Sequence, residues 1–387
     1  YIVKNQIGSE TDGLFSSHYT YNNDEQVYTT AYKYNGVTKS NKTYNYKKIN
    51  QNGYIHNTNI IDSSTDSAST YGYDYVYTYD TAGDITAITK NGASYKDYIY
   101  DNSNRISTEQ FNDGTYQYFY DSNNNIESVL TFNDMQIPYE GYMYGYSSGN
   151  KLSSLYYMDI NYSTTEPAET YNYTYDAMGN PLSYYTRRGW GIVNMNLTWE
   201  QGTKLDEVDT WNYVYDYSYD ENGMRYLKER KNQSGTVLGT TRYYLDGATI
   251  IAENREGTLI QYYHDSTGAV GMRYNGVDYF YVKDDLGNVI EVRNASTNAL
   301  VASYDYNAWG EYTSNGSMAS INPFRYRGYY QDNETDFYYL QTRYYDAFLK
   351  RFVSPDNPEL LPNLIASGEL NLYTYCGNNP VMYTDST

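Results

Sequence analysis

The chain has 387 residues, of which 47 are acidic and 27 basic, so its formal net charge is −20. This charge excludes nucleic acid and anionic membranes as expected partners, because both are bound through clustered lysine and arginine. No stretch approaches the ~18 apolar residues of a membrane-spanning helix. A single cysteine, Cys376, excludes an internal disulfide, and the separated histidines His18, His56 and His264 predict neither a metal centre nor a cofactor.

Tyrosine is the unusual residue, with 57 copies against 9 phenylalanines and 4 tryptophans. Its ring is apolar but its hydroxyl needs a partner or water, so walls built from tyrosine are expected to be wet on at least one side. The chain begins at Tyr1 without a methionine or a signal-like run. We therefore expect a piece of a longer protein.

Residues 1–65 carry an irregular form of a tyrosine repeat. Alternating tyrosines, such as Tyr19 with Tyr21 and Tyr32 with Tyr34, predict strands with one aromatic face. Asn-Gly pairs reverse the chain between strands, and they stand at 35–36 and 52–53.

Residues 66–320 carry the regular form of the repeat. The pattern is Tyr-x-Tyr-Asp with Gly or Asn three residues after the Asp, and it recurs about every 20 to 26 residues. Copies begin at Tyr77, Tyr98, Tyr118, Tyr173 and Tyr217. A fixed period of this length is typical of a repeat architecture, in which one unit cannot bury its own face and must stack on its neighbours.

Each unit predicts a β-hairpin. Tyrosines at i, i+2 and i+4, as in 75–79, place their rings on one face of a strand. The turn at 80–83 follows, where Asp bonds the backbone ahead of it and Gly supplies a positive φ. A second strand comes at 85–89, and Asn-Gly signals at 91–92 and 112–114 then reverse the chain. The sequence therefore predicts an all-β protein, a long antiparallel ribbon.

The spacing doubles between Tyr175 and Tyr219, which predicts a degenerate unit at 197–205 with Trp199 in the tyrosine place and Glu200 in the aspartate place. We expect the repeat tyrosines to be ladder residues and the repeat aspartates to be turn residues, none of them catalytic. Exposed aromatic stripes would also suit sugars, which stack on rings.

Residues 321–387 break the repeat and carry four motifs in order. They are Arg-Tyr-Arg-Gly-Tyr-Tyr at 325–330, Tyr-Tyr-Leu-Gln-Thr-Arg-Tyr-Tyr-Asp at 338–346, Arg-Phe-Val-Ser-Pro-Asp at 351–356 and Asn-Leu-Tyr-Thr-Tyr-Cys-Gly-Asn-Asn-Pro at 371–380. Two further stretches, 281–288 and 304–311, precede them.

This series resembles the Rhs-repeat-associated core, which closes the repeat region of bacterial Rhs proteins and of the C component of Tc toxins. The hairpin array before it is similar to the YD repeats of those proteins and of animal teneurins. The resemblance implies a hollow β-shell, in which the hairpin ribbon spirals around a large cavity and the core curls in as a plug. A variable toxic C-terminal segment would lie inside.

The resemblance also implies that the core cuts the chain between itself and that segment, in the style of an aspartic protease. Carried over by position, the cutting group would be Arg343, Asp356 and Asp385. Two close carboxylates share one proton, so that one activates water and the other protonates the carbonyl, while an arginine holds the pair. The family usually continues Asp-Pro-x-Gly, but this chain reads Asp385-Ser386-Thr387, so the Pro is missing and the cleaved bond would lie beyond Thr387.

Each of these three residues also has a structural explanation. Arg343 could stack on a ring, Asp356 could cap a short helix over the residues that follow it, and Asp385 could be a turn residue.

Three functions are weighed. The first is a toxin-encapsulating Rhs shell with a self-cleaving core, and the second is an adhesion or glycan-binding YD-repeat protein without catalysis. The third is a glycosidase, and only scattered carboxylates support it. The expected partners are the chain's own C-terminal toxin segment, a secretion or immunity partner, or a cell-surface glycan. The expected location is secreted or at the bacterial cell surface.

Overall fold

The computed structural model of the protein describes residues 7–51, 54–67, 72–111, 114–159, 169–189, 191–356 and 371–385. Four features expected from the sequence lie outside these residues in whole or part: the turns at 52–53 and 112–114, a helix after Asp356, and Ser386. No helix in the described ranges is long and apolar enough to cross a bilayer.

Three antiparallel sheets make up the fold, and within each sheet every strand pairs with its neighbours in sequence. The first sheet has 14 strands: β1 (Ser9–Asp12), β2 (Phe15–Tyr21), β3 (Val27–Tyr34), β4 (Val37–Gln51), β5 (Tyr54–Asp66), β6 (Tyr75–Tyr79), β7 (Ile85–Lys90), β8 (Ala93–Tyr100), β9 (Ile106–Phe111), β10 (Gly114–Tyr120), β11 (Ile126–Asn133), β12 (Pro138–Ser147), β13 (Lys151–Asp159) and β14 (Glu169–Asn172).

The second sheet also has 14 strands: β15 (Thr174–Tyr175), β16 (Pro181–Arg188), β17 (Gly191–Glu200), β18 (Lys204–Thr210), β19 (Val214–Tyr219), β20 (Arg225–Lys231), β21 (Val237–Asp246), β22 (Thr249–Arg255), β23 (Thr258–Asp265), β24 (Gly268–Tyr274), β25 (Val277–Lys283), β26 (Val289–Asn294), β27 (Leu300–Tyr306) and β28 (Tyr312–Asn315). The third sheet has four: β29 (Tyr330–Gln331), β30 (Tyr338–Leu340), β31 (Arg343–Asp346) and β32 (Arg351–Phe352). Two 3₁₀ turns, η2 (Tyr326–Gly328) and η4 (Cys376–Asn378), complete the described elements. The all-β hairpin ribbon expected from the sequence is confirmed.

The aspartate of each repeat builds the turn that makes the hairpin. The Asp80 carboxylate accepts hydrogen bonds from the backbone N–H groups of Ala82, Gly83 and Asp84, at 2.9 to 3.0 Å. Gly83 has a φ of 95°, a conformation that costs glycine little. The same aspartate cap recurs at Asp121, Asp176, Asp220 and Asp284. The expected turn chemistry is therefore confirmed.

The last tyrosine of a repeat ties its hairpin to the one before. The Tyr120 hydroxyl donates to the Ile106 carbonyl at 2.6 Å, and the Tyr100 hydroxyl donates to the Ile85 carbonyl at 2.7 Å. In the degenerate unit the Trp199 indole N–H donates to the Pro181 carbonyl at 2.7 Å. Trp199 therefore takes the tyrosine place as predicted, in the paired strands β17 and β18.

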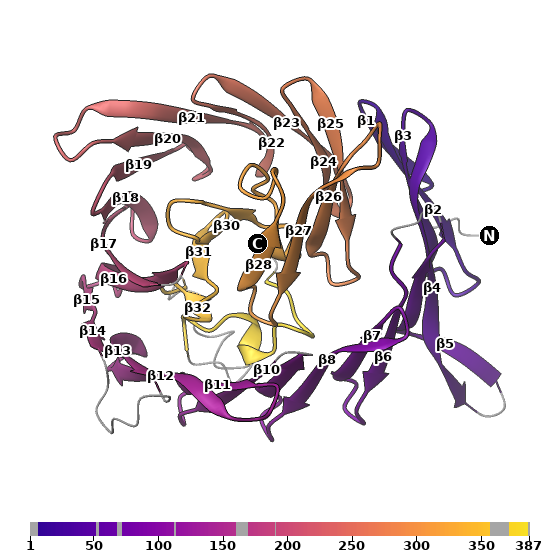
Figure 1. The fold of residues 1–387 in the computed structure, drawn as a ribbon, viewed down its shortest axis with the longest axis horizontal. Helices are drawn as coiled ribbons and strands as arrows, with labels where there is room; N and C mark the ends of the chain where they lie inside the picture. The colour runs from indigo at the N-terminus through magenta and orange to yellow at the C-terminus, as the bar shows by residue number, and fades with distance from the viewer. Residues whose placement is uncertain are drawn as a thin grey trace.

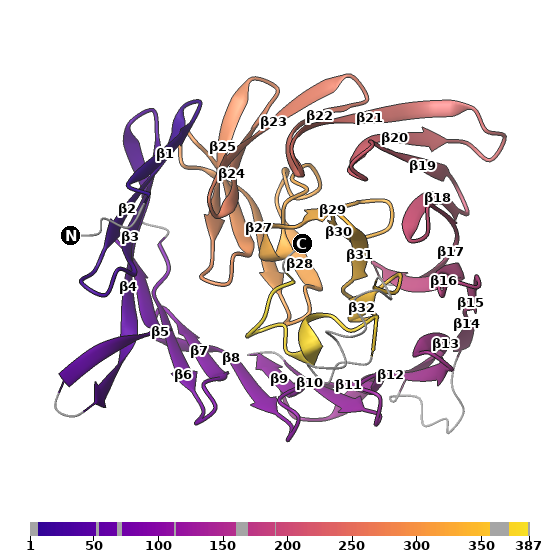
Figure 2. The ribbon, with the colours of Figure 1, turned by 180° about the vertical axis from the view of Figure 1, so that it is seen from behind.

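The ribbon winds once around a ring, and its first hairpin returns to its later strands (Figures 1 and 2). The Ser17 hydroxyl donates to the Asp265 carboxylate at 2.5 Å, and the His264 N–H donates to the Asp12 carboxylate at 3.0 Å. The rings of Phe15 and Tyr263 pack with their centroids 4.4 Å apart. Contacts between strands far apart in sequence thus join β1 and β2 to β23.

The C-terminal segment lies inside this ring, coloured orange to yellow in Figures 1 and 2. We call residues 321–356 and 371–385 the plug, and β1 to β28 the wall. Wall tyrosines that point inward are buried against the plug, with Tyr77, Tyr98 and Tyr118 between 2% and 6% exposed. These rings are therefore shielded from water, and the hydroxyls of Tyr77 and Tyr118 donate to the carboxylates of Asp285 and Glu109.

Three plug tyrosines fasten a turn at the end of the wall. The turn connects β27 to β28, and its residue Trp309 is fully buried. The hydroxyls of Tyr326, Tyr345 and Tyr338 donate to the carbonyls of Ala308, Trp309 and Gly310 at 2.7, 2.7 and 2.9 Å. Wall and plug thus share one hydrophobic core, and buried hydrogen bonds connect them.

Candidate functional site

The three residues assigned to cutting by resemblance come together in the plug. Arg343 begins β31, Asp356 follows β32, and Asp385 lies at the end of the described chain. One guanidinium nitrogen, Nη2 of Arg343, lies 3.3 Å from the Asp356 carboxylate and 3.2 Å from the Asp385 carboxylate. The two acids therefore face the same cation.

Local structure fixes the arginine between the acids. The Arg343 guanidinium stacks on the ring of Phe352, 3.5 Å from its centroid, so the predicted ring stacking and the carboxylate contacts occur together. Its Nη1 donates to the Leu372 carbonyl at 3.5 Å, and the Asp356 N–H donates to the same carbonyl at 2.9 Å. Segments 351–356 and 371–374 are thereby held side by side beneath the site.

Partial burial shifts the pKa values of two groups at this site. The side chains of Arg343, Asp356 and Asp385 are 13%, 26% and 21% exposed. Burial raises the pKa of Asp385 and the charge of Asp356 raises it further, while Arg343 opposes both effects. Burial lowers the pKa of Arg343 from its usual value, although both carboxylates oppose it.

This arrangement can hold one carboxyl protonated beside one that is ionised. The raised pKa of Asp385, caused first by burial, favours the protonated form of that acid. A protonated acid and a carboxylate on one cation are the pair that water activation at a peptide bond requires.

The Cys376 thiol near the site is not a nucleophile at neutral pH. Burial raises the pKa of the Cys376 thiol to about 12, so the thiol stays protonated. The Tyr329 hydroxyl donates to the Asp385 carbonyl at 3.4 Å and helps to hold the end of the chain in place. The described residues include no group of three or more His, Cys, Asp or Glu side chains arranged to hold a metal ion.

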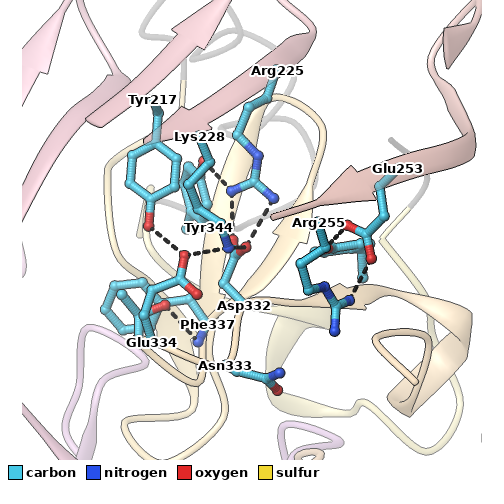
Figure 3. Close-up of polar contacts among 12 residues, drawn as sticks. Tyr217, Arg225, Lys228, Glu253, Arg255, Asp332, Asn333, Glu334, Phe337 and Tyr344 are labelled. Carbon is cyan, nitrogen blue, oxygen red and sulfur yellow. Dashed lines mark hydrogen bonds and ion pairs between the residues drawn. The ribbon is translucent and has the colours of Figure 1, made fainter. Parts of the chain in front are cut away.

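A second polar cluster joins wall to plug, and the sequence analysis missed it (Figure 3). Arg225 of β20 binds both oxygens of Asp332 in the plug, at 2.5 and 3.0 Å, and both side chains are fully buried. Lys228 lies 3.2 Å from Asp332 and 2.6 Å from Glu334. The Tyr330 hydroxyl donates to Glu253 of β22 at 2.6 Å, next to this cluster.

A signal for this cluster was present in the repeat. The position after each turn is apolar in other units, as at Ile85, Ile106 and Ile126, but here it is Arg225. Glu109 likewise stands where neighbouring units have Ile88 or Val129. A charge at a position that the repeat buries must be paired or neutralised, so such exceptions mark long-range contacts. Arg225 meets Asp332 of the plug, and Glu109 accepts the Ala308 N–H in the turn between β27 and β28.

In this fold a ribbon of β-hairpins winds around its own C-terminal segment. This arrangement places the protein in the class of β-shells with an internal plug. A family model, the teneurin YD-shell, matches residues 217–381. The tRNA nuclease WapA of Bacillus subtilis is 29% identical over 269 residues, covering 57% of this chain and 11% of that protein. Double-stranded DNA deaminase toxin A of Burkholderia cenocepacia is 25% identical over 276 residues, covering 62% of this chain and 17% of that protein.

Solved structures share the fold. The Photorhabdus luminescens Tc holotoxin pore superposes with a TM-score of 0.68 at 17% identity, over 95% of this chain and 18% of that one. The TcdB2-TccC3 structure without its hypervariable C-terminal region gives 0.51 at 15% identity, over 97% of this chain and 21% of that one. These matches confirm the resemblance to Rhs/YD-repeat proteins that the repeat and the C-terminal motifs indicated. The chain spans less than a quarter of the length of these relatives.

Proposed function

We propose that this chain is part of a toxin-type Rhs protein, exported to the bacterial surface or beyond, whose β-shell encloses a C-terminal toxin segment. In this proposal the plug cuts the chain between itself and that segment, with Asp356, Asp385 and Arg343 as the cutting group. The relatives named as nuclease and deaminase toxins support the toxin class. The observation that carries the cleavage proposal is the contact of one arginine nitrogen with both acids.

In the proposed reaction Asp356 is ionised and Asp385 is protonated. Asp356 takes a proton from water as the water oxygen attacks the peptide carbonyl carbon, and Asp385 gives its proton to the carbonyl oxygen. Collapse of the tetrahedral intermediate breaks the C–N bond, and the nitrogen leaves with a proton from the pair. Arg343 stabilises whichever acid carries the negative charge at each stage.

The shell part of the proposal rests on the wall. The wall makes one circuit, and the plug lies inside it and shares its hydrophobic core (Figure 1). This chain would therefore contribute one layer of container wall together with the stopper. The rest of the container would come from other parts of a longer protein.

The experiment uses the chain extended past Thr387 by its own downstream coding sequence. We expect purified protein to separate into two fragments on a denaturing gel, with mass spectrometry placing the cut beyond Thr387. Asp356→Asn, Asp385→Asn and Arg343→Leu should each leave one intact chain. Asp246→Asn is the matched control, because Asp246 is an exposed acid at the end of β21.

Intact wild-type chain, or cleavage that persists in Asp356→Asn, would reject the cutting group. Enclosure is measured separately, by adding protease to the folded protein. The C-terminal segment should resist digestion until denaturant opens the shell, and digestion in native buffer would reject enclosure whatever the result for cleavage.

A further inference from the structure

A cavity of about 1230 Å³ lies between β16 to β24 of the wall and the plug loop that follows β29. We propose that it binds an uncharged oligosaccharide. Its volume exceeds the ~300–1,000 Å³ of pockets for drug-sized ligands, so it has room for several sugar rings. This site is separate from the cutting group, and none of Arg343, Asp356 and Asp385 lines it.

Cross-strand neighbours on one face of the sheet form the floor of the cavity. Tyr215 of β19 pairs with Arg230 of β20, which pairs with Gly239 of β21. Gly239 has no side chain, and the Glu256 side chain occupies the space that a Cβ at this position would fill. Glu256 thus reaches across the strand to Arg230, with an N–O distance of 2.8 Å.

The cations that line the cavity are already neutralised. Besides the Arg230–Glu256 pair, Lys228 binds Glu334 and Asp332, Arg188 lies 3.2 Å from Asp336, and Arg255 binds Glu253. Figure 3 shows the pairs of Lys228 and Arg255 beside the plug. A phosphate or sulfate ligand would have to break such pairs and would meet the acids beside them. The charges therefore favour an uncharged ligand over a polyanion.

A polypeptide is also disfavoured as the occupant. Extended peptides bind sheets by adding a strand to an open edge, where backbone groups are unpaired. Strands β19 to β24 are paired in order on both sides, so this cavity meets the face of a sheet instead of an edge. The groups on offer are side-chain hydroxyls, amides and rings, with Thr241 and Asn333 on the wall and plug sides.

One exposed and two half-buried aromatic side chains line part of the cavity: Trp211, Tyr213 and Tyr215. Trp211 is 92% exposed, in a tight turn that Thr210 holds by accepting the Tyr213 N–H at 3.1 Å and donating to the Tyr213 carbonyl at 2.7 Å. The rings of Tyr213 and Tyr215 follow, 6.3 Å apart and steeply inclined. The exposed Trp211 indole lies beside a cavity that is rich in hydroxyl groups and whose charged side chains are paired. Sugar rings suit such a site, because their apolar faces stack on aromatic rings and their hydroxyls form hydrogen bonds with polar groups.

The test is isothermal titration calorimetry of the full chain with maltohexaose, cellohexaose, xylohexaose, mannohexaose and chitohexaose, each to about 10 mM, which covers the millimolar range of weak sites. We expect at least one of them to bind. Trp211→Ala and Tyr213→Ala should each weaken binding about tenfold, which is the loss of one good ring contact. Tyr244→Ala should leave binding unchanged, because Tyr244 is 43% exposed but absent from the cavity lining.

Trp211 is so exposed that its replacement should not alter the urea midpoint, which serves as the check on folding. The proposal is overturned if none of the five sugars binds, or if binding survives both aromatic substitutions. It is also overturned if a heparin hexasaccharide or an extended peptide binds in a Trp211-dependent way while the neutral sugars do not. Asp356→Asn should bind like wild type, so the result is independent of the proposed cleavage.

Discussion

Arg225 of the wall and Asp332 of the plug form a two-pronged ion pair from which water is excluded, with N–O distances of 2.5 and 3.0 Å. Burial alone would raise the pKa of Asp332, but Arg225 and Lys228 outweigh it and hold that pKa below its usual value. The pair therefore contributes stability at neutral pH. That contribution is lost as the pH falls below the unfolded-state pKa and through the folded one.

Arg225→Met should destabilise the protein by about 3–5 kcal/mol, because it leaves the Asp332 charge buried with only Lys228 to balance it. The double change Arg225→Met with Asp332→Leu should cost clearly less than the sum of the two single changes, since no unpaired charge remains. Urea unfolding followed by far-ultraviolet circular dichroism measures all four proteins. Additive single-mutant effects would contradict a coupled pair.

Gly310 and Gly287 offer a matched comparison in two turns. Their φ values are 92° and 85°, but a Cβ at Gly310 would lie 2.7 Å from the ring of Tyr326, whereas one at Gly287 would meet nothing within 4 Å. Gly287→Ala should cost about 1 kcal/mol from backbone strain alone. Gly310→Ala should cost about 3 kcal/mol, because the buried ring must also move. Equal thermal midpoints for the two variants would show that the ring contact is unimportant.

Tyr120→Phe tests the hydroxyl that links successive hairpins. It removes the donor to the Ile106 carbonyl and should cost about 1 kcal/mol, the net value of one such hydrogen bond. Tyr244→Phe, on an exposed ring of β21, should change the unfolding free energy by less than about 0.5 kcal/mol. If both variants unfold at the wild-type urea concentration, the ladder bond contributes no stability.

Glu109 should make stability depend on pH in the opposite sense to Asp332. Burial raises its pKa to about 7, although Lys96 and the Ala308 N–H, which donates to it at 2.7 Å, oppose this rise. The unfolded pKa is ~4.3, so the folded state binds more protons between about pH 4.3 and 7, and stability falls as the pH rises through that window. The loss amounts to as much as roughly 4 kcal/mol.

Glu109→Gln should flatten this part of the profile of urea midpoint against pH, measured from about pH 5 to 8, where a carboxyl of this pKa changes charge. Glu127→Gln is the control, because Glu127 is exposed on β11, two strands away from Glu109 on β9, and should leave the slope unchanged. An unaltered slope in Glu109→Gln would show that another group titrates in this window.

The sequence predicted the site of Arg343, Asp356 and Asp385 only through the resemblance of its motifs to a known family. Nothing local to Arg343, Asp356 or Asp385 indicates that one guanidinium nitrogen would contact both acids. That contact depends on residues 371–385 folding back beside β31 and β32, which is a long-range event. The same holds for Arg225 and Asp332, since the repeat position marks Arg225 as buried but does not say what it meets.

The sequence by itself determined the hairpins, their turns and the tyrosine ladder, because these depend on residues a few positions apart: an aspartate caps its own turn, and alternate rings share one face. Only the tertiary structure decided that the ribbon closes by laying β1 and β2 against β23, and that wall tyrosines such as Tyr77, Tyr98 and Tyr118 are buried. It also decided which buried charges pair. Closure and burial are set by the summed twist of many strands and by packing around the plug, and no short stretch of sequence specifies either.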